Sequence, residues 1–209
     1  MQFDLFGNPP HPNQTLDEFL AEMYAMDDDP LAGAGTNVVI CRGNPGAKLT
    51  IVGEAPGPQE NIQGRPFVGR AGKLLDQILA AAGFDPDKDV FITNSVFRMP
   101  PGEDKAFRAP TGPEIEAYKP YLLEILRLVD PKILLLTGNV ACQSLLGETG
   151  ITRLRGEWRR IDGRWVMPIF HPSYLLRNPS RSPGSPKALM WEDIREVRRK
   201  WESLKEGEK

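Results

Sequence analysis

Cysteine is scarce in this chain, and long apolar runs are missing. The two cysteines, Cys41 and Cys142, lie far apart, so they lack the paired spacing of a disulfide framework or a cysteine-rich metal site. We interpret them as reduced thiols of a cytosolic protein and place Cys142, which falls in an apolar helical pattern, in the core. No run approaches the roughly 18 apolar residues of a membrane span. The start at Met1–Asp4 lacks the basic residues of a secretory signal.

Lysine and arginine are absent from the first 41 residues, which hold seven of the 28 acidic residues. In the remainder, 26 basic residues face 21 acidic ones, so the net charge of −2 conceals a positive body. Many of its cations come late in the chain: Arg153, Arg155, Arg159, Arg160, Arg164, Arg177, Arg181 and Lys187. Such a run is either a solvated face or a surface that follows DNA phosphates, which supply most non-specific DNA affinity. Charge alone leaves both interpretations open.

Apolar, β-branched runs alternate with helical patterns, and a chain that is 40% apolar can bury one core. The predicted strands are residues 48–53, 89–94 and 132–137, followed by a hairpin with arms 158–162 and 164–170. The predicted helices are residues 16–26, 69–82, 114–130, 139–146 and 188–204. This alternation predicts an α/β fold, with three α/β/α layers around a central, mainly parallel, four-stranded sheet. We expect one domain over residues 15–209, preceded by a flexible tether of residues 1–14.

Polar side chains stand where three of the predicted strands end. Glu54 opens the turn after the strand 48–53, Asn94 ends the strand 89–94, and His171 follows the last apolar run. In open α/β sheets, ligands bind beyond the carboxyl ends of the strands. We therefore expect these three side chains to converge on one edge of the sheet, as an active site.

The chemistry of these residues suits a flat, polar ligand. Asn94 offers a donor and an acceptor to an amide edge, and His171 can donate to a developing oxyanion. Phe67 stands in a rigid turn and can stack on a ring, while Ala55 and Gly57 turn backbone N–H groups inward. Taken singly, each residue has an ordinary explanation as a turn former or a core side chain. Their combined order favours a site.

That order resembles the uracil-DNA glycosylase superfamily over about residues 37–200. Three further segments resemble its family 4, the thermophile and bacterial branch: Gly64–Leu75, Thr93–Val96 with Pro100–Gly102, and Lys119–Leu122. The resemblance implies an enzyme that flips uracil out of DNA and hydrolyses its N-glycosidic bond, leaving an abasic site. It also implies a uracil-DNA glycosylase-like fold and a location in the bacterial cytosol or nucleoid.

The resemblance assigns a role to each matching residue. Phe67 stacks on the flipped uracil, Asn94 reads its amide edge, and His171 stabilises negative charge on the departing base. Glu54 orients or activates water and offsets positive charge on the sugar. Glu60 lies beside C5 of the base, where it excludes the methyl group of thymine.

The resemblance also implies DNA contacts outside the base pocket. Leu175 is the expected wedge that fills the vacated place in the base stack. Ser173 and Arg177 hold phosphates. Lys105 and Arg108, in the long loop 99–111, are candidates for contacts to the strand.

One departure concerns a cofactor. Family 4 enzymes hold a [4Fe–4S] cluster with four cysteines, and alignment places these ligands at Met26, Asp29, Arg98 and Tyr118. None of the four is a thiol, and such clusters need Cys thiolates. We expect a relative without the cluster or any other metal, in which an ion pair between Asp29 and Arg98 holds the N-terminal segment.

A second motif lies at the N-terminus. Gln2–Phe6 resembles the short peptide by which bacterial replication and repair proteins bind the sliding clamp. The peptide makes the clamp a candidate partner of the enzyme, which we expect to be monomeric and to act on uracil-containing DNA.

Two alternative functions stay open: a non-catalytic or weakly catalytic relative that binds damaged or abasic DNA, and a glycosylase with broader specificity for deaminated bases. The joint presence of Glu54, Asn94, Phe67 and His171 favours the enzyme over the binding protein.

Overall fold

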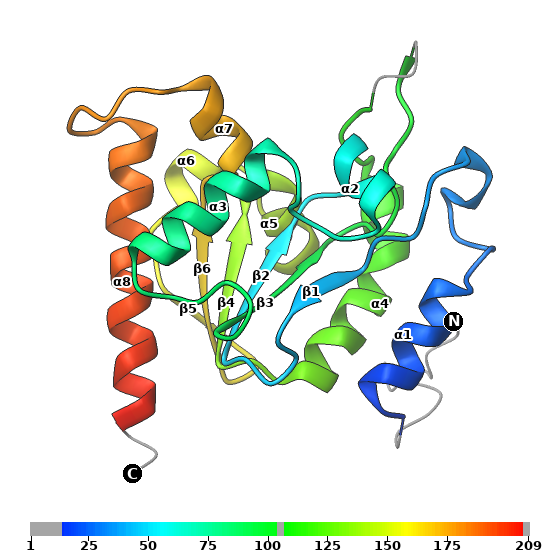
Figure 1. Cartoon of the computed structure of the whole chain (residues 1–209), viewed down its shortest axis with the longest axis horizontal. Helices are drawn as coiled ribbons and strands as arrows, with labels where there is room; N and C mark the ends of the chain where they lie inside the picture. Colours follow the sequence, from blue (N-terminus) through cyan, green and yellow to red (C-terminus); the bar gives the residue numbers. More distant parts are fainter. Residues whose placement is uncertain (1–13, 104–106, 207–209) are drawn as a thin grey trace.

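A six-stranded sheet runs through the computed structural model, which describes residues 14–103 and 107–206 (Figure 1). The strand order is β1-β3-β2-β4-β6-β5. The four inner strands are parallel: β2 (Leu49–Gly53), β3 (Val90–Asn94), β4 (Ile133–Thr137) and β6 (Arg164–Ile169). The edge strands β1 (Cys41–Gly43) and β5 (Arg159–Ile161) are antiparallel to their neighbours. The mainly parallel sheet is confirmed, and its strand count is corrected from four to six.

The inner strands are apolar because both faces of the sheet are covered. All five residues of β2, β3 and β4 are buried, as expected for parallel strands between two layers of helices. The hairpin β5–β6 matches the sequence prediction. Strand β1 was missed because it has only three residues and no apolar run, and it forms by pairing with β3.

Helices lie on both faces of the sheet, which confirms the three-layer arrangement. The longer ones are α1 (Leu16–Tyr24), α3 (Arg70–Ala81), α4 (Gly112–Val129), α5 (Gly138–Leu146) and α8 (Pro186–Glu206). The short ones, which the sequence patterns did not predict, are α2 (Pro58–Gln63), α6 (Ile151–Leu154), α7 (Pro172–Arg177) and the 3₁₀ turn η1 (Ala32–Ala34). None of the helices in the described ranges is long and apolar enough to cross a membrane.

Two apolar cores separate the layers. Helices α1, α4 and α5 pack on one face, where Phe19, Leu122 and the free thiol Cys142 are buried together. Helices α3, α7 and α8 pack on the other, around Leu75 and Ile194. The core position expected for Cys142 is therefore confirmed.

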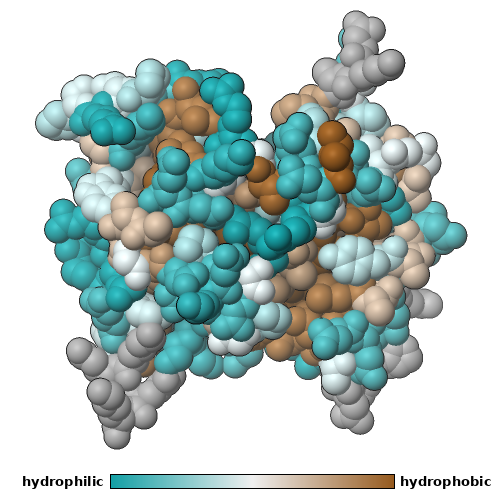
Figure 2. Space-filling model, in the orientation of Figure 1, coloured by the Kyte–Doolittle hydropathy of each residue, from teal (hydrophilic) through white to brown (hydrophobic). Residues whose placement is uncertain are grey.

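The carboxyl ends of the parallel strands all point toward one edge of the molecule. Figure 1 shows α7, α2 and the beginning of α3 gathered at this edge, beyond the arrowheads of β2, β4 and β6. Figure 2 shows a notch in the outline at the same edge, between the part that carries α7 and the part that carries α2. Most of the face drawn there is hydrophilic, with separated apolar patches.

Candidate active site

Asn94 and Phe67 meet above the end of β2. Gly53 is the last residue of β2 and pairs in register with Asn94 of β3. A Cβ placed on Gly53 would lie 2.3 Å from Oδ1 of Asn94 and 2.5 Å from Cε2 of Phe67. The amide and the aromatic ring therefore share the space that a side chain at Gly53 would otherwise fill.

The ring of Phe67 also lies next to the ring of His171. The ring centroids of Phe67 and His171 lie 5.8 Å apart, with the planes tilted by 35°. His171 directly precedes α7 and follows β6 by one residue. The convergence expected for Asn94, Phe67 and His171 is thus present, with Phe67 in the middle.

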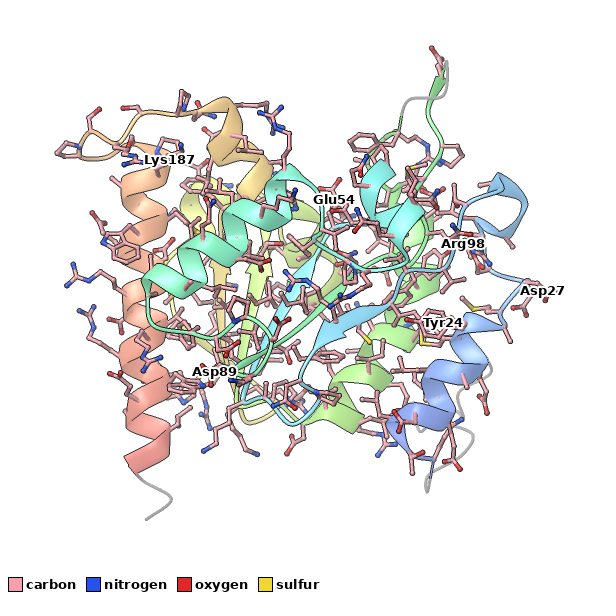
Figure 3. All side chains as sticks on the ribbon, in the orientation of Figure 1. Tyr24, Asp27, Glu54, Asp89, Arg98 and Lys187 are labelled. Atoms are coloured by element: carbon pink, nitrogen blue, oxygen red, sulfur yellow. The ribbon has the colours of Figure 1, made fainter. Side chains whose placement is uncertain are left out.

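Glu54 lies at the carboxyl end of β2, where Figure 3 shows it at the edge of the sheet. Its backbone carbonyl accepts a hydrogen bond from the N–H of Val96 at 3.1 Å, which ties the turn after β2 to the segment after β3. Burial raises the pKa of the Glu54 carboxyl, and the charge of Arg177 opposes that rise. Since Arg177 also lowers the pKa of His171, the carboxylate and the imidazole lie within the field of one cation.

His171 is held as a neutral donor. Its Nδ1 accepts a hydrogen bond from the N–H of Ser173 at 3.2 Å and lies 2.8 Å from Oγ of the same residue. An acceptor at Nδ1 assigns the hydrogen of the neutral ring to Nε2. Burial, and then the charge of Arg177, lowers the pKa of His171 to about 4. The ring is therefore uncharged at neutral pH and can donate from Nε2.

Glu60 supports the turn that carries Phe67. Its Oε1 accepts hydrogen bonds from the N–H groups of Val68 at 3.0 Å and Gly69 at 2.8 Å, at the N-terminus of α3. A Cβ on Gly57 would lie 2.8 Å from the other carboxylate oxygen, so this glycine leaves room for Glu60. Glu60 thus lies next to the site, with one oxygen already engaged by the backbone.

The structure places Leu175, the residue expected to act as the wedge, in the core. Leu175 is 0% exposed and packs beneath α7, so its side chain does not reach the surface in this structure, and its role as a wedge stays a prediction. Helix α7 presents the neighbouring Tyr174 and Leu176 instead, which are 37% and 36% exposed. Ser173, expected at a phosphate, is bonded to His171 in this structure.

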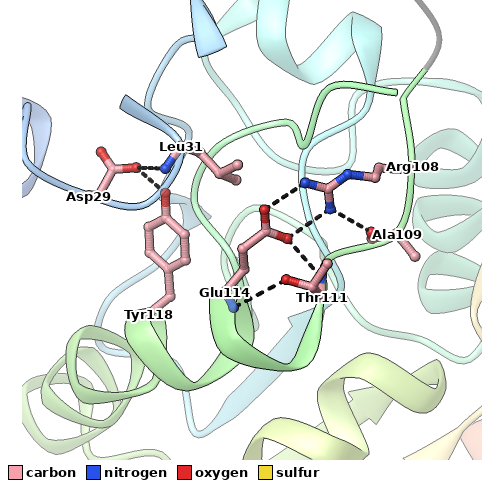
Figure 4. Close-up of polar contacts among 7 residues, drawn as sticks. All are labelled: Asp29, Leu31, Arg108, Ala109, Thr111, Glu114 and Tyr118. Atoms are coloured by element: carbon pink, nitrogen blue, oxygen red, sulfur yellow. Dashed lines mark hydrogen bonds and ion pairs between the residues drawn. The ribbon is translucent and has the colours of Figure 1, made fainter. Parts of the chain in front are cut away.

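The arginines proposed to follow phosphates are partly engaged in ion pairs. Arg108 forms a two-pronged ion pair with Glu114, at 2.8 and 2.6 Å (Figure 4). Three of the five arginines between residues 153 and 164 also pair with carboxylates: Arg155, Arg159 and Arg164. These pairs favour a structural role for that run. Lys105 lies outside the described residues, as does the Gln2–Phe6 peptide.

Two glycines with a role in the site carried no recognised signal in the sequence. Gly138 follows β4 with φ of +85°, and a Cβ there would lie 3.1 Å from Cβ of His171. Gly72, in α3, leaves space for the backbone of Phe67, whose carbonyl oxygen would lie 1.9 Å from an added Cβ. A glycine directly after a predicted strand was the available hint for Gly138, whereas the position of Gly72 depends on tertiary contact.

Comparison with known proteins decides the family. The model of the uracil DNA glycosylase superfamily matches residues 41–195. The chain belongs to the uracil DNA glycosylase superfamily.

Relatives within this superfamily align over most of the chain. It is 37% identical over 174 residues to the type-4 uracil-DNA glycosylase of Thermotoga maritima, covering 81% of this chain and 85% of that protein. It is 35% identical over 176 residues to the protein of the same name from Archaeoglobus fulgidus, covering 79% and 85%. A DNA polymerase of Bacillus phage SP01 is 37% identical over 138 residues, covering 66% of this chain and 14% of the polymerase.

The positions that the family resemblance assigns to cluster cysteines form a polar network in this glycosylase-superfamily chain. Nε of Arg98 donates to Oδ2 of Asp29 at 2.7 Å, so the ion pair expected from the sequence is confirmed. Nη2 of Arg98 donates to the carbonyl oxygen of Met26 at 2.7 Å. The hydroxyl of Tyr118 donates to the other oxygen of Asp29 (Figure 4).

This donor set does not fit an iron–sulfur cluster. A thioether, a carboxylate, a guanidinium and a phenol stand where thiolates are needed, and the carboxylate is already satisfied by Arg98 and Tyr118. Figure 3 shows Arg98 on the side of the molecule nearer α1 and apart from Glu54. The network therefore joins the segment after α1 to the rest of the fold.

Proposed function

We propose that this protein is a monofunctional uracil-DNA glycosylase, which takes uracil out of the base stack of DNA and hydrolyses its N-glycosidic bond. The observation that carries the proposal is the meeting of Asn94 and Phe67 above Gly53, with His171 next to the Phe67 ring and Glu54 directly after Gly53 in the chain. A planar ligand against Phe67 has an amide on one side and a neutral imidazole on the other. Uracil has the matching shape, with a flat ring and an amide edge.

Binding requires the nucleotide to leave the duplex. Extrusion costs a few kcal/mol of unstacking and unpairing. Stacking on Phe67 and hydrogen bonding to Asn94 offset that cost, and the turn 66–69 places the ring where the base arrives. Uracil presents a donor at N3 and an acceptor at O4, whereas cytosine presents an acceptor at N3 and a donor at N4, so an Asn94 amide held in one orientation discriminates between these two bases.

Bond cleavage separates charge between base and sugar. The bond between N1 of uracil and C1′ breaks with its electron pair moving to N1, which leaves a uracil anion and an oxocarbenium-like sugar. His171 donates from Nε2 to an oxygen of the base, where negative charge accumulates. A fixed donor of this kind contributes about 10²–10³-fold to the rate.

Glu54 acts on the sugar side. Its carboxylate offsets the positive charge at C1′ and accepts the proton of the attacking water, which forms the new C1′–O bond and leaves an abasic site. General base catalysis contributes about 10²–10⁴-fold. Neither Glu54 nor His171 carries the amine needed for a Schiff base, which is why the proposed reaction stops at the abasic site.

An assay with labelled oligonucleotides tests the proposal. Single strands containing uracil, and duplexes with uracil opposite G or A, are incubated with the wild type, Glu54→Ala and His171→Ala. The wild type should release uracil, and each variant should be slower by about 10²-fold or more. A wild type that binds abasic DNA tightly but releases no uracil would show that the protein is a binding relative instead. Oligonucleotides with hypoxanthine or xanthine in the same assay test broader specificity.

The peptide Gln2–Phe6 extends the proposal to a partner. We propose that it binds the sliding clamp and brings the enzyme to newly replicated DNA. Deletion of residues 1–7 should abolish clamp binding and leave uracil release from short oligonucleotides intact. Equal clamp binding by the shortened and full-length chains would remove this partner.

A further inference from the structure

Phe67 is held in a conformation that its side chain does not favour. Its φ is +54°, in the left-handed region that non-glycine residues rarely adopt. Such a conformation is strained and persists only when the surrounding structure enforces it. The contacts around the turn 66–69 therefore decide where the Phe67 ring lies.

Arg42 donates hydrogen bonds to the carbonyl oxygens of this turn. It comes from the edge strand β1, and its side chain is only 5% exposed. Nε donates to the carbonyl oxygen of Pro66 at 2.9 Å, and Nη2 lies 3.4 Å from the carbonyl oxygen of Phe67. Asp76 of α3 holds the guanidinium in place, with Oδ1 at 2.5 Å from Nη2.

Glu60 accepts hydrogen bonds from the backbone N–H groups of the same turn. Its Oε1 accepts from the N–H groups of Val68 and Gly69, which directly follow Phe67. The turn thus lies between a cation on its carbonyl oxygens and an anion on its N–H groups. Gly72 completes the fit, because any side chain there would overlap the Phe67 carbonyl.

We propose that Arg42 and Asp76 are positioning residues for base recognition, which hold the Phe67 turn so that its ring meets the flipped base. This inference rests on the proposed function, because it concerns how Phe67 engages the base. Without the guanidinium, Phe67 can relax toward negative φ, and its ring moves away from the space above Gly53. A misplacement of about 1 Å in a site of this kind can lower the rate by about 10²-fold.

A double-mutant cycle between Arg42→Met and Phe67→Ala tests the inference. The measured quantities are kcat/KM on a uracil-containing oligonucleotide and the inhibition constant of free uracil. Arg42→Met alone should lower kcat/KM by about 10²-fold and weaken inhibition by uracil. In the Phe67→Ala background it should have less than about a twofold further effect, because the ring it positions is gone. Equal losses in both backgrounds would overturn the inference.

Asp76→Asn is the second variant, for the case that Arg42→Met fails to fold. Asp76 is 37% exposed, and asparagine retains the shape of the aspartate side chain. Asp76→Asn should also lower kcat/KM, by a smaller factor than Arg42→Met. A merely structural role would lower the melting temperature but leave the uracil inhibition constant of the active enzyme unchanged, which would also overturn the inference.

Arg98→Met is the matched control, because it removes another buried arginine paired with an aspartate, away from the Phe67 turn. Its effect should be the same with and without Phe67. Failure of the proposed function gives a different result from failure of this inference. If the wild type releases no uracil, both fall; if it is active and the Arg42 and Phe67 effects multiply, only the positioning role falls.

Discussion

Asp29 and Arg98 are 69 residues apart in the chain, yet they form an ion pair in which the carboxylate is fully buried. Asp29 also accepts from the hydroxyl of Tyr118 and from the N–H of Leu31, at 2.9 Å in the latter case. One carboxylate thus joins the segment after α1, the segment after β3 and helix α4. Its removal leaves the buried guanidinium of Arg98 without an anionic partner.

The stability of the N-terminal segment should depend on this pair. Breaking a buried ion pair by removing one partner costs about 3–5 kcal/mol, so Asp29→Leu should lower the free energy of unfolding by about that amount. Urea unfolding, followed by circular dichroism, measures it. Lys132→Met provides the control, because its pair with Asp130 is exposed and contributes about 0–1 kcal/mol. Similar losses for the two variants would contradict the assigned importance of the buried pair.

The pH profile of kcat/KM should have an acid limb and no loss near pH 7. Glu54 works as a carboxylate, so activity should rise with pH through its pKa, which burial raises above the ordinary value of a glutamate. His171 donates as a neutral ring, and because its pKa is about 4, it gains no proton on going from pH 8 to pH 6. Measurement between pH 5 and pH 9 checks the profile. A fall in rate between pH 6.5 and 8, where an ordinary imidazole titrates, would indicate that His171 acts as a charged acid instead.

Arg177→Gln should move the acid limb to higher pH. Its charge lowers the pKa of Glu54, so without it protons are bound more tightly and a higher pH is needed to form the carboxylate. The same change raises the pKa of His171. Arg199→Gln, which removes an exposed arginine paired with Glu196, is the control and should leave the profile in place. The comparison of both profiles at one ionic strength measures the shift.

Gly53→Ala should abolish most of the activity while preserving the sheet. The added methyl would overlap both Oδ1 of Asn94 and the ring of Phe67, and displacing either should cost about 10²-fold in kcat/KM. Gly33→Ala is the control, since nothing lies within 4 Å of a Cβ there and its φ is outside the left-handed region. Comparable kinetics for the two variants would show that the space above β2 is not where the substrate binds.

Alanine substitutions at Leu175 and Leu176 should differ in their effect on the free energy of unfolding, because only Leu175 is fully buried. Leu175→Ala removes a fully buried side chain and should cost about 2–5 kcal/mol of unfolding free energy. Leu176→Ala alters an exposed position and should stay within about 0.5 kcal/mol of the wild type. Thermal unfolding of both variants measures the difference. A larger loss for Leu176→Ala would contradict the orientation of α7 described here.

The sequence predicted the parallel strands and the edge at which their polar ends meet, because apolar runs and the residues after them are local signals. Glu54, Asn94 and His171 could be grouped in this way. The burial of Leu175 could not be foreseen, since a six-residue helix is too short to reveal its buried face by periodicity. Arg42 was missed for a different reason. Its partners lie 24 to 34 residues away, and only the folded chain brings them together.

The width of the site follows from the order of the strands. Strands β2 and β4 separate the strand that ends in Asn94 from the strand that leads to His171. Neighbouring strands are held about 4.8 Å apart by their hydrogen bonds, so these two backbone anchors are separated by roughly 14 Å. The sheet therefore sets the distance between these two anchors, and loosening of the surface turns should leave that distance unchanged.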